Sequence, residues 1–347
     1  MQIVAILICS LLAFTLLVAV TNYVTDPAGI YRPSKSKQAR NLRLRKLSLL
    51  RALRRAPYAT LVLGSSRVFN LSLAADARFP QPTLNFAVTT AKAEDYLACY
   101  RLARAAQTQP PSLVIIGIEH PAFHPTMRPQ WEAYTAGIYT DELEAIGALR
   151  RGLGWRQRML LSPTQFHQSL IEIQRLGRSR GGLAALLVTG RWRSQGSARQ
   201  KFRWSADGSG TWMDVLEGKR NPKLLARQLR NFPRSGLGIS SYTRIGQQRL
   251  RWFELLLEQC AADGTQVIAY IVPAHPLLVE KTWRLGFQPM HEQLVNALRV
   301  ASSQHGAVFH DWYDGSALGL DDSHFRDVMH LTDEGQAIIA RRLAESN

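Results

Sequence analysis

The sequence predicts an α/β domain built as three layers, with a mainly parallel β-sheet between helices, preceded by one transmembrane helix. Three observations predict it. The chain begins with a long uncharged apolar run, short apolar and β-branched runs recur along the remainder, and segments with helical spacing separate those runs. The chain has 347 residues, of which 46% are hydrophobic, so we expect one large domain with a substantial core.

The first element is the apolar run at 3–20, which holds no charged residue and is long enough to cross a bilayer as a helix. A cleaved signal peptide is the alternative. No Lys or Arg precedes the run, and no convincing small-x-small cleavage site follows it. We therefore predict an uncleaved membrane anchor at 1–24.

A basic neck at 25–56 follows the anchor. Residues 32–55 include ten Lys or Arg and no acid, and residues 121–235 hold nineteen bases against eight acids. The net charge of the whole chain is +17, so these two stretches carry all of its excess. Such segments attract anionic polysaccharide or lipid. Nucleic acid is not expected as a partner, because no nucleic-acid-binding motif accompanies the charge.

Two readings of the neck bear on orientation in the membrane. The positive-inside tendency alone would place the neck and the domain in the cytoplasm. The segment 41–56 also has the spacing of a basic amphipathic helix, which can lie on an anionic membrane surface on either side.

The predicted domain occupies 57–347, and its elements alternate. Nearly continuous apolar runs predict buried parallel strands, and the segments between or after them show helical spacing. We expect strands at 59–66, 83–88, 112–119, 266–273 and 307–312, and helices at 91–107, 242–262, 286–303 and 333–344. Residues 120–240 break this pattern and predict an insert of loops and helices, in which Arg191, Arg193, Arg199 and Lys201 could bind an anionic partner.

Polar residues fall at or just past the carboxyl ends of three predicted strands, where parallel sheets collect reactive groups. They are Ser66, Asn85 and Glu119. Ser66 stands between a strand and a predicted turn, which would expose its hydroxyl and aim its backbone N–H at a developing oxyanion. Taken alone, the Gly-Ser-Ser sequence is more typical of a helix cap than of a nucleophile.

The end of the chain supplies a base for this serine. Asp327 and His330 are three residues apart just before the last predicted helix, so the carboxylate can hold one ring nitrogen while the other faces Ser66. Asp321 and His324 form a rival pair with the same spacing. We prefer the later pair because the Leu-Thr and Gly that follow complete a recognisable pattern.

These motifs resemble those of the SGNH, or GDSL-like, hydrolase superfamily. The resemblance covers 57–120 and 242–345, and rests on Gly64-x-Ser66, on "LNFAVTT" after the second strand, and on the terminal Asp-x-x-His. It implies a flavodoxin-like three-layer fold and a catalytic triad of Ser66, Asp327 and His330. It implies no cofactor and no metal.

The chain departs from the superfamily pattern at several positions. Ser65 replaces the usual Asp of the first block, and Ala87 stands where glycine is common, although its backbone N–H remains a weak oxyanion candidate. Glu119 stands where the third block supplies an Asn, and an anionic side chain there would oppose an oxyanion. Asn85 is a possible substitute donor, and Arg67 is a possible substrate contact.

The anchor together with Gly-Ser-Ser-Arg resembles a membrane-anchored branch of cell-surface polymer O-acylation proteins, which includes the D-alanyl-lipoteichoic acid transfer protein and proteins that acetylate alginate or cellulose. The resemblance implies acyl transfer or ester hydrolysis on a cell-envelope polysaccharide, with an acyl-exporting integral membrane protein as a partner. It implies a bacterial inner-membrane location with a periplasmic domain, although the positive-inside tendency alone would place the domain in the cytoplasm. The alternative is a non-catalytic accessory protein that binds anionic glycan or lipid through its basic insert.

Overall fold

The computed structural model describes residues 2–26, 46, 49–50, 57–127, 138–148, 160–177, 202–212, 222–231 and 241–346. Contacts divide the chain into two compact units. One comprises Met1–Ser48 and Gln130–Arg199, and the other comprises Leu49–Pro129 and Gln200–Asn347. Most of the basic neck lies outside the described residues, as do Arg191, Arg193, Arg199 and Lys201 of the insert, so their predicted roles stay predictions.

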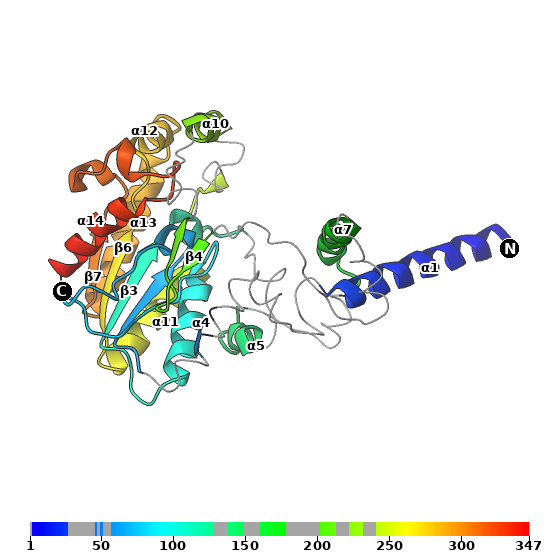
Figure 1. Ribbon diagram of the computed structural model, residues 1–347, viewed down its shortest axis with the longest axis horizontal. Coiled ribbons are helices and arrows are strands. Elements are labelled where there is room, and N and C mark those ends of the chain that lie inside the picture. Colours follow the sequence, from blue (N-terminus) through cyan, green and yellow to red (C-terminus); the bar gives the residue numbers. More distant parts are fainter. Residues whose placement is uncertain are drawn as a thin grey trace. The chain divides into compact units, whose positions relative to one another are not determined.

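The second unit is an α/β structure around a five-stranded sheet in the order β2-β1-β3-β6-β7 (Figure 1). Every neighbouring pair is parallel, which confirms the predicted parallel sheet. The strands are β1 (Thr60–Gly64), β2 (Thr83–Asn85), β3 (Leu113–Ile118), β6 (Gln266–Ile271) and β7 (Val308–Asp311). The central strands β1 and β3 are buried along their whole length, as their continuous apolar sequences require.

Helices connect these strands in an arrangement compatible with three layers. They are α4 (Ala93–Ala105), α11 (Gln247–Ala262), α12 (Pro276–Arg284), α13 (Gln288–Gln304) and α14 (Asp333–Ala344). Helix α11 packs against both α4 and α13, so these three form one neighbouring set. Four of the five match predicted helices; α12 was not predicted. It begins at a proline directly after His275, whose ring accepts the Leu277 N–H as a cap.

Part of the predicted insert belongs to the sheet unit. Strands β4 (Phe202–Trp204) and β5 (Gly210–Trp212) form an antiparallel hairpin, and α10 (Pro222–Asn231) follows it. The N–H of Asn85 in edge strand β2 donates to the carbonyl of Asp207 in the hairpin turn (2.7 Å). The hairpin therefore covers the β2 edge, which would otherwise expose an unpaired backbone donor.

The first unit contains α1 (Gln2–Thr25), α5 (Ile138–Ala145) and α7 (Pro163–Gly177). Within the described part of the chain, α1 is the one helix long and apolar enough to cross a membrane, judged by length and composition. This agrees with the predicted anchor, while the side of the membrane and the membrane type stay predictions.

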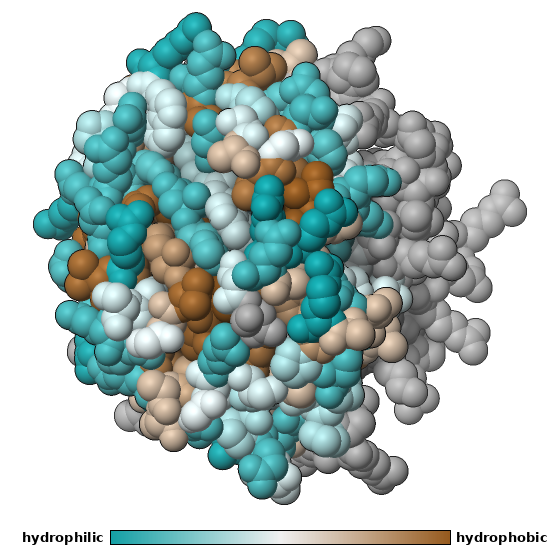
Figure 2. All heavy atoms as spheres, turned by 90° about the vertical axis from the view of Figure 1, so that its left-hand side faces the viewer, coloured by the Kyte–Doolittle hydropathy of each residue, from teal (hydrophilic) through white to brown (hydrophobic). Residues whose placement is uncertain are grey.

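Exposed apolar side chains concentrate in α1. Among the described residues, twelve of the seventeen exposed large hydrophobic side chains belong to this helix, beginning with Ile3, which is 75% exposed. By contrast, Figure 2 shows one face of the sheet unit, where hydrophilic side chains dominate and apolar ones form small separate groups. A contiguous apolar surface of this kind on α1 is typical of contact with lipid.

Candidate active site

Ser66 lies on a tight turn at the carboxyl end of β1. Gly64 has φ +150°, and a Cβ there would come within 2.6 Å of a methyl group of Val68. Ser65 then caps a short 3-10 turn, Ser66–Val68, by accepting the N–H of Arg67 on its hydroxyl (3.2 Å). The turn leaves Ser66 only half-buried, whereas the residues on either side are buried. A nucleophile needs such access to its substrate.

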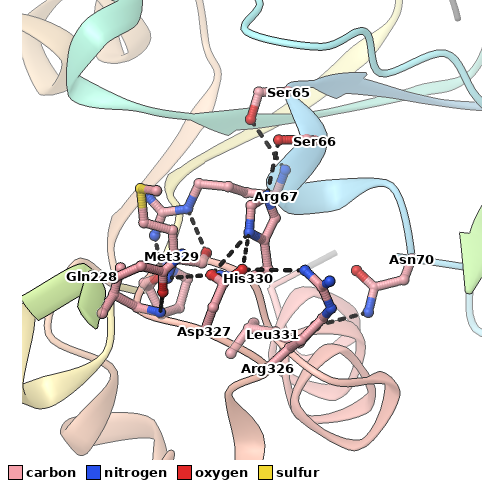
Figure 3. A network of polar contacts seen from close by, with 12 residues as sticks. Ser65, Ser66, Arg67, Asn70, Gln228, Arg326, Asp327, Met329, His330 and Leu331 are labelled. Atoms are coloured by element: carbon pink, nitrogen blue, oxygen red, sulfur yellow. Dashed lines mark hydrogen bonds and ion pairs between the residues drawn. The ribbon is translucent and has the colours of Figure 1, made fainter. Parts of the chain in front are cut away.

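The structure brings Ser66, His330 and Asp327 together (Figure 3). The hydroxyl Oγ of Ser66 is 3.0 Å from Nε2 of His330. Nδ1 of His330 is 2.9 Å from one carboxylate oxygen of Asp327 and 3.0 Å from the other. An ionised carboxylate only accepts hydrogen bonds, so Nδ1 carries the proton. In the neutral ring Nε2 then accepts the Ser66 hydroxyl, as a general base must.

Asp327 is held ionised by its surroundings. Burial raises the pKa of this carboxyl, but the hydrogen bond and charge of His330 and the backbone N–H groups of Met329 and His330 outweigh burial and lower it to about 2. Both N–H groups donate to the same oxygen at 2.9 Å. Arg326 donates to the second oxygen at 3.2 Å. The carboxylate therefore stays charged and fixes the orientation of the ring.

Three buried side chains join the serine turn to the histidine loop. Arg67 Nε donates to the carbonyl of Met329 (2.8 Å), and Asn70 Nδ2 donates to the carbonyl of Leu331 (3.0 Å). Gln336, on α14, donates to the carbonyl of Arg67 (2.7 Å). These contacts link segments more than 260 residues apart and so fix the distance between nucleophile and base.

Arg67 holds a structural position, and the substrate contact predicted for it stays a prediction. Its guanidinium donates to the carbonyls of Val272 and Pro273, directly after β6, as well as to Met329. Burial lowers the pKa of Arg67, and the nearby charge of Glu119 opposes that shift. The side chain is 6% exposed, and its Nε and Nη2 groups donate to backbone carbonyls.

The two weak oxyanion candidates at the end of β2 and just after it are also corrected. The N–H of Ala87 donates to Oδ1 of Asn85 (3.1 Å). The amide group of Asn85 in turn donates to the carbonyls of Val68 (2.7 Å) and Leu71 (3.0 Å). Both residues are fully buried, so they hold the serine loop in place and their donors are already used.

Glu119 is a buried counter-ion. It is 8% exposed at the end of β3, and its charge raises the pKa of two buried cations, Arg67 and Lys92. Burial acts in the opposite direction and is the larger effect on Lys92, whose pKa falls to about 8. Glu119 thus offsets part of the free-energy cost of burying these two positively charged side chains.

Within the serine turn that the structure describes, one backbone donor remains for an oxyanion. The N–H groups of Arg67, Val68 and Phe69 are all used within the turn. The N–H of Ser66 itself donates to no group among the described residues. It therefore is the donor that a developing oxyanion at Ser66 would meet.

The rival pair has a different environment. His324 Nδ1 is 2.8 Å from a carboxylate oxygen of Asp321, but the Asp321 side chain is 70% exposed. The one serine in its contacts is the adjacent Ser323, at 3.4 Å. Asp321 caps its own short turn, and the hydrogen bonds of that turn lower its pKa. The geometry therefore favours His330 over His324 as the histidine partner of Ser66.

Sequence reasoning missed a second series of hydrogen-bonded polar side chains, which begins next to Glu119. His120 Nε2 is 2.8 Å from Nδ1 of His291, and Nε2 of His291 is 2.9 Å from a carboxylate oxygen of Asp311. Burial lowers the pKa of His120 far below its usual value, and His291 and Arg67 add to this. No local motif connects these residues, which come from the ends of β3 and β7 and from α13.

Within the described ranges, no group of three or more His, Cys, Asp or Glu side chains could hold a metal ion. Comparison of the chain with protein-family models and with curated proteins found no match.

Proposed function

We propose that the chain is a membrane-anchored serine acyltransferase or esterase of the SGNH type. The observation that carries the proposal is the alignment of Ser66, His330 and Asp327, with hydrogen bonds of 3.0 Å and 2.9 Å between successive members. The position of the serine after the first strand, and of the Asp-x-x-His before the last helix, also supports it.

The reaction proceeds by double displacement. His330 Nε2 takes the proton of Ser66 as Oγ bonds to the carbonyl carbon of an ester donor, and the Ser66 N–H stabilises the oxyanion. The C–O bond of the donor then breaks, and its alcohol leaves with the proton from His330. In the second half, His330 takes a proton from an acceptor hydroxyl, whose oxygen attacks the acyl group and releases Ser66 with its proton restored.

The acceptor is a hydroxyl of a cell-envelope polysaccharide, or water in the hydrolytic reaction. The apolar helix α1 supports a location at the membrane, which also brings the site close to an integral membrane protein that delivers acyl groups. The domain is proposed to face the periplasm. A reporter fused after Asn347 that is active only in the periplasm is the expected result; activity only in the cytoplasm would contradict this orientation.

A fluorophosphonate probe tests the nucleophile directly, because it forms a covalent bond with an activated serine. The wild-type chain is expected to label, with the mass of the adduct on the peptide that contains Ser66. Ser66→Ala removes the label, whereas Ser65→Ala, one residue away, retains a measurable part of it. Equal labelling of wild type and Ser66→Ala, or no labelling of the wild type, would support the accessory-protein alternative.

Hydrolysis and transfer are separated by the acceptor. Release of acetate from a small acetyl ester by the full chain, unaffected by added polysaccharide, would indicate an esterase. Faster turnover on adding an oligosaccharide, with the acyl group recovered on the sugar, would indicate a transferase.

A further inference from the structure

The carboxyl-terminal third of α1 has a specific partner within its unit. Asn22 donates to the carbonyl of Leu160 (2.6 Å) and is 2% exposed. Thr25 donates to the hydroxyl of Ser169 (2.6 Å), which in turn donates to Oδ1 of Asn22 (2.9 Å). A removable leader needs no buried polar contacts to a segment 138 or more residues away. These hydrogen bonds of Asn22 and Thr25, called the Asn22 junction below, therefore indicate a chain that keeps α1.

The contact between α1 and α7 also involves apolar side chains. The ring of Phe14 packs edge-on against that of Phe166, with 6.5 Å between centroids. Val18, one turn further along α1, is 8% exposed, whereas the earlier part of the helix is open along its length. Helix α7 thus meets α1 between Phe14 and Thr25.

The position of this contact along α1 gives its depth. A helix rises about 1.5 Å per residue, and the hydrocarbon core is about 30 Å thick, so about 20 residues cross it. Counted from Ile3, such a span ends at Asn22. The polar junction therefore falls at the boundary of the hydrocarbon core, and Phe14 lies about 12 Å inside it.

The direction of α7 fits this boundary. Figure 1 draws α1 lengthwise and α7 nearly end-on beside the carboxyl-terminal part of α1, so their axes cross steeply. If α1 runs along the membrane normal, a helix that crosses it in this way runs along the membrane plane. Interfacial helices have this orientation.

Two apolar side chains in or beside α7 are about half exposed among the described residues. Leu170 is 47% exposed, and Leu161, just before the helix, is 49% exposed. Each directly follows a residue that hydrogen-bonds to Asn22, namely Leu160 and Ser169, so both lie near the depth of Asn22 on α1. Lipid must surround the exposed apolar surface of α1 if this helix spans the membrane. Exposed apolar side chains at that depth are therefore expected to contact lipid as well.

We propose that α7 is an interfacial helix that lies at the boundary of the hydrocarbon core, with Leu161 and Leu170 in contact with lipid, and that the hydrogen bonds of Asn22 hold it at this depth. The ten bases at 32–55 favour a membrane with anionic head groups. The proposal rests on the anchor, and it is independent of the chemistry at Ser66.

Site-directed fluorescence in vesicles tests this with the full chain. An NBD dye on a cysteine is measured in vesicles of phosphatidylglycerol and phosphatidylethanolamine, with and without lipids that carry a shallow doxyl quencher. The native Cys9, exposed in α1, serves as the lipid-facing control, and Cys99 and Cys260 are buried. In a Cys9→Ser background, Leu170→Cys is the test position.

Val300→Cys is the matched negative control, because Val300 is an exposed apolar residue (55%) on α13 of the sheet unit. The dye at position 170 is expected to be quenched about twofold or more by doxyl lipid, comparably to Cys9, whereas the dye at position 300 is unchanged. Leu161→Cys repeats the measurement at an independent site in case one label disturbs the helix.

Two results would overturn the proposal. One is a dye at positions 161 and 170 that behaves as at position 300 while Cys9 remains quenched. The other is efficient disulfide crosslinking between chains at position 170 without lipid quenching, which would show that a second copy covers this face.

The junction is tested by Asn22→Leu, which removes the hydrogen bonds to the segment before α7 but leaves α1 apolar. Quenching at position 170 is expected to fall, while Cys9 keeps its lipid contact in the same variant. Ser10→Leu, an exposed position on the same helix, should change neither value. Equal quenching at position 170 in both variants would show that Asn22 does not seat α7.

Discussion

Asp327→Asn gives the sharpest test of the candidate site. The asparagine keeps the size of the side chain, and its oxygen can still accept the N–H groups of Met329 and His330. It adds an NH₂ donor, however, which favours the His330 tautomer that carries its proton on Nε2. That ring no longer accepts the Ser66 hydroxyl, so labelling by a fluorophosphonate should slow by roughly ten-thousand-fold.

The same substitution has a predicted cost in stability. The pKa of Asp327 falls from 3.8 to about 2 in the folded chain, and one unit corresponds to about 1.4 kcal/mol, so the ionised carboxylate contributes about 2 kcal/mol. Because the folded pKa lies below the unfolded one, this contribution is complete above pH 3.8 and is lost as the pH falls through about 2. Denaturant unfolding of the full chain in detergent at neutral pH should show a loss of that size.

The structure supplies a matched control. Asp321 has the same spacing to a histidine and a similar contact of 2.8 Å, but its side chain is 70% exposed. Asp321→Asn should leave the labelling rate within about twofold and the unfolding free energy nearly unchanged, as expected of exposed ion pairs. The reasoning is refuted if Asp327→Asn labels at the wild-type rate, or if Asp321→Asn shows the large loss instead.

Three further predictions concern the surroundings of the triad. Asn70→Ala leaves buried groups of the serine turn and histidine loop without a partner, so it should cost about 1–3 kcal/mol in denaturant unfolding and slow the labelling of Ser66; an unchanged labelling rate would contradict its positioning role. In Gly117→Ala, the added Cβ would lie 2.4 Å from a Val68 methyl group, which should displace the serine turn, slow labelling and cost about 1–3 kcal/mol. The pKa of His120 is lowered in the folded chain, so between pH 7 and pH 5 the unfolded chain binds a proton there that the folded chain does not bind. The free energy of unfolding should therefore fall as the pH is lowered from 7 to 5. His120→Gln should flatten that fall, and an identical pH dependence in both proteins would show that other groups cause it.

The sequence predicted the features that local patterns encode. Continuous apolar runs such as the one at β3 predict buried parallel strands, because both faces of such a sheet are covered. The pairing of Ser66 with His330 was predicted from motif positions, and the structure brings the two side chains together. The predicted domain boundaries stay predictions, since they fall partly outside the described residues.

The residues that hold the site together were not predicted. Arg67 and Asn70 form hydrogen bonds with backbone carbonyls more than 260 residues away. Every residue carries such a carbonyl, so residue types do not indicate which carbonyl accepts the bond. Ala87 and Asn85 are oxyanion candidates by resemblance to the superfamily blocks, whereas local hydrogen bonds use up their donors. The partner of Asn22 was equally hidden, since an isolated serine or asparagine pattern gives no signal of contact across the chain.

The placement of the triad along the chain has a consequence for biosynthesis. Ser66 is made 264 residues before His330, the base that contacts it. At a ribosomal rate of about 5–20 residues per second, the serine waits roughly 10–50 s for its partner. The histidine loop is the last segment before the final helix, and its carbonyls complete the hydrogen bonds of Arg67 and Asn70. A nascent or truncated chain that ends before His330 therefore carries a Ser66 hydroxyl without this partner, and reactivity of Ser66 would report that the histidine loop has been made and has folded.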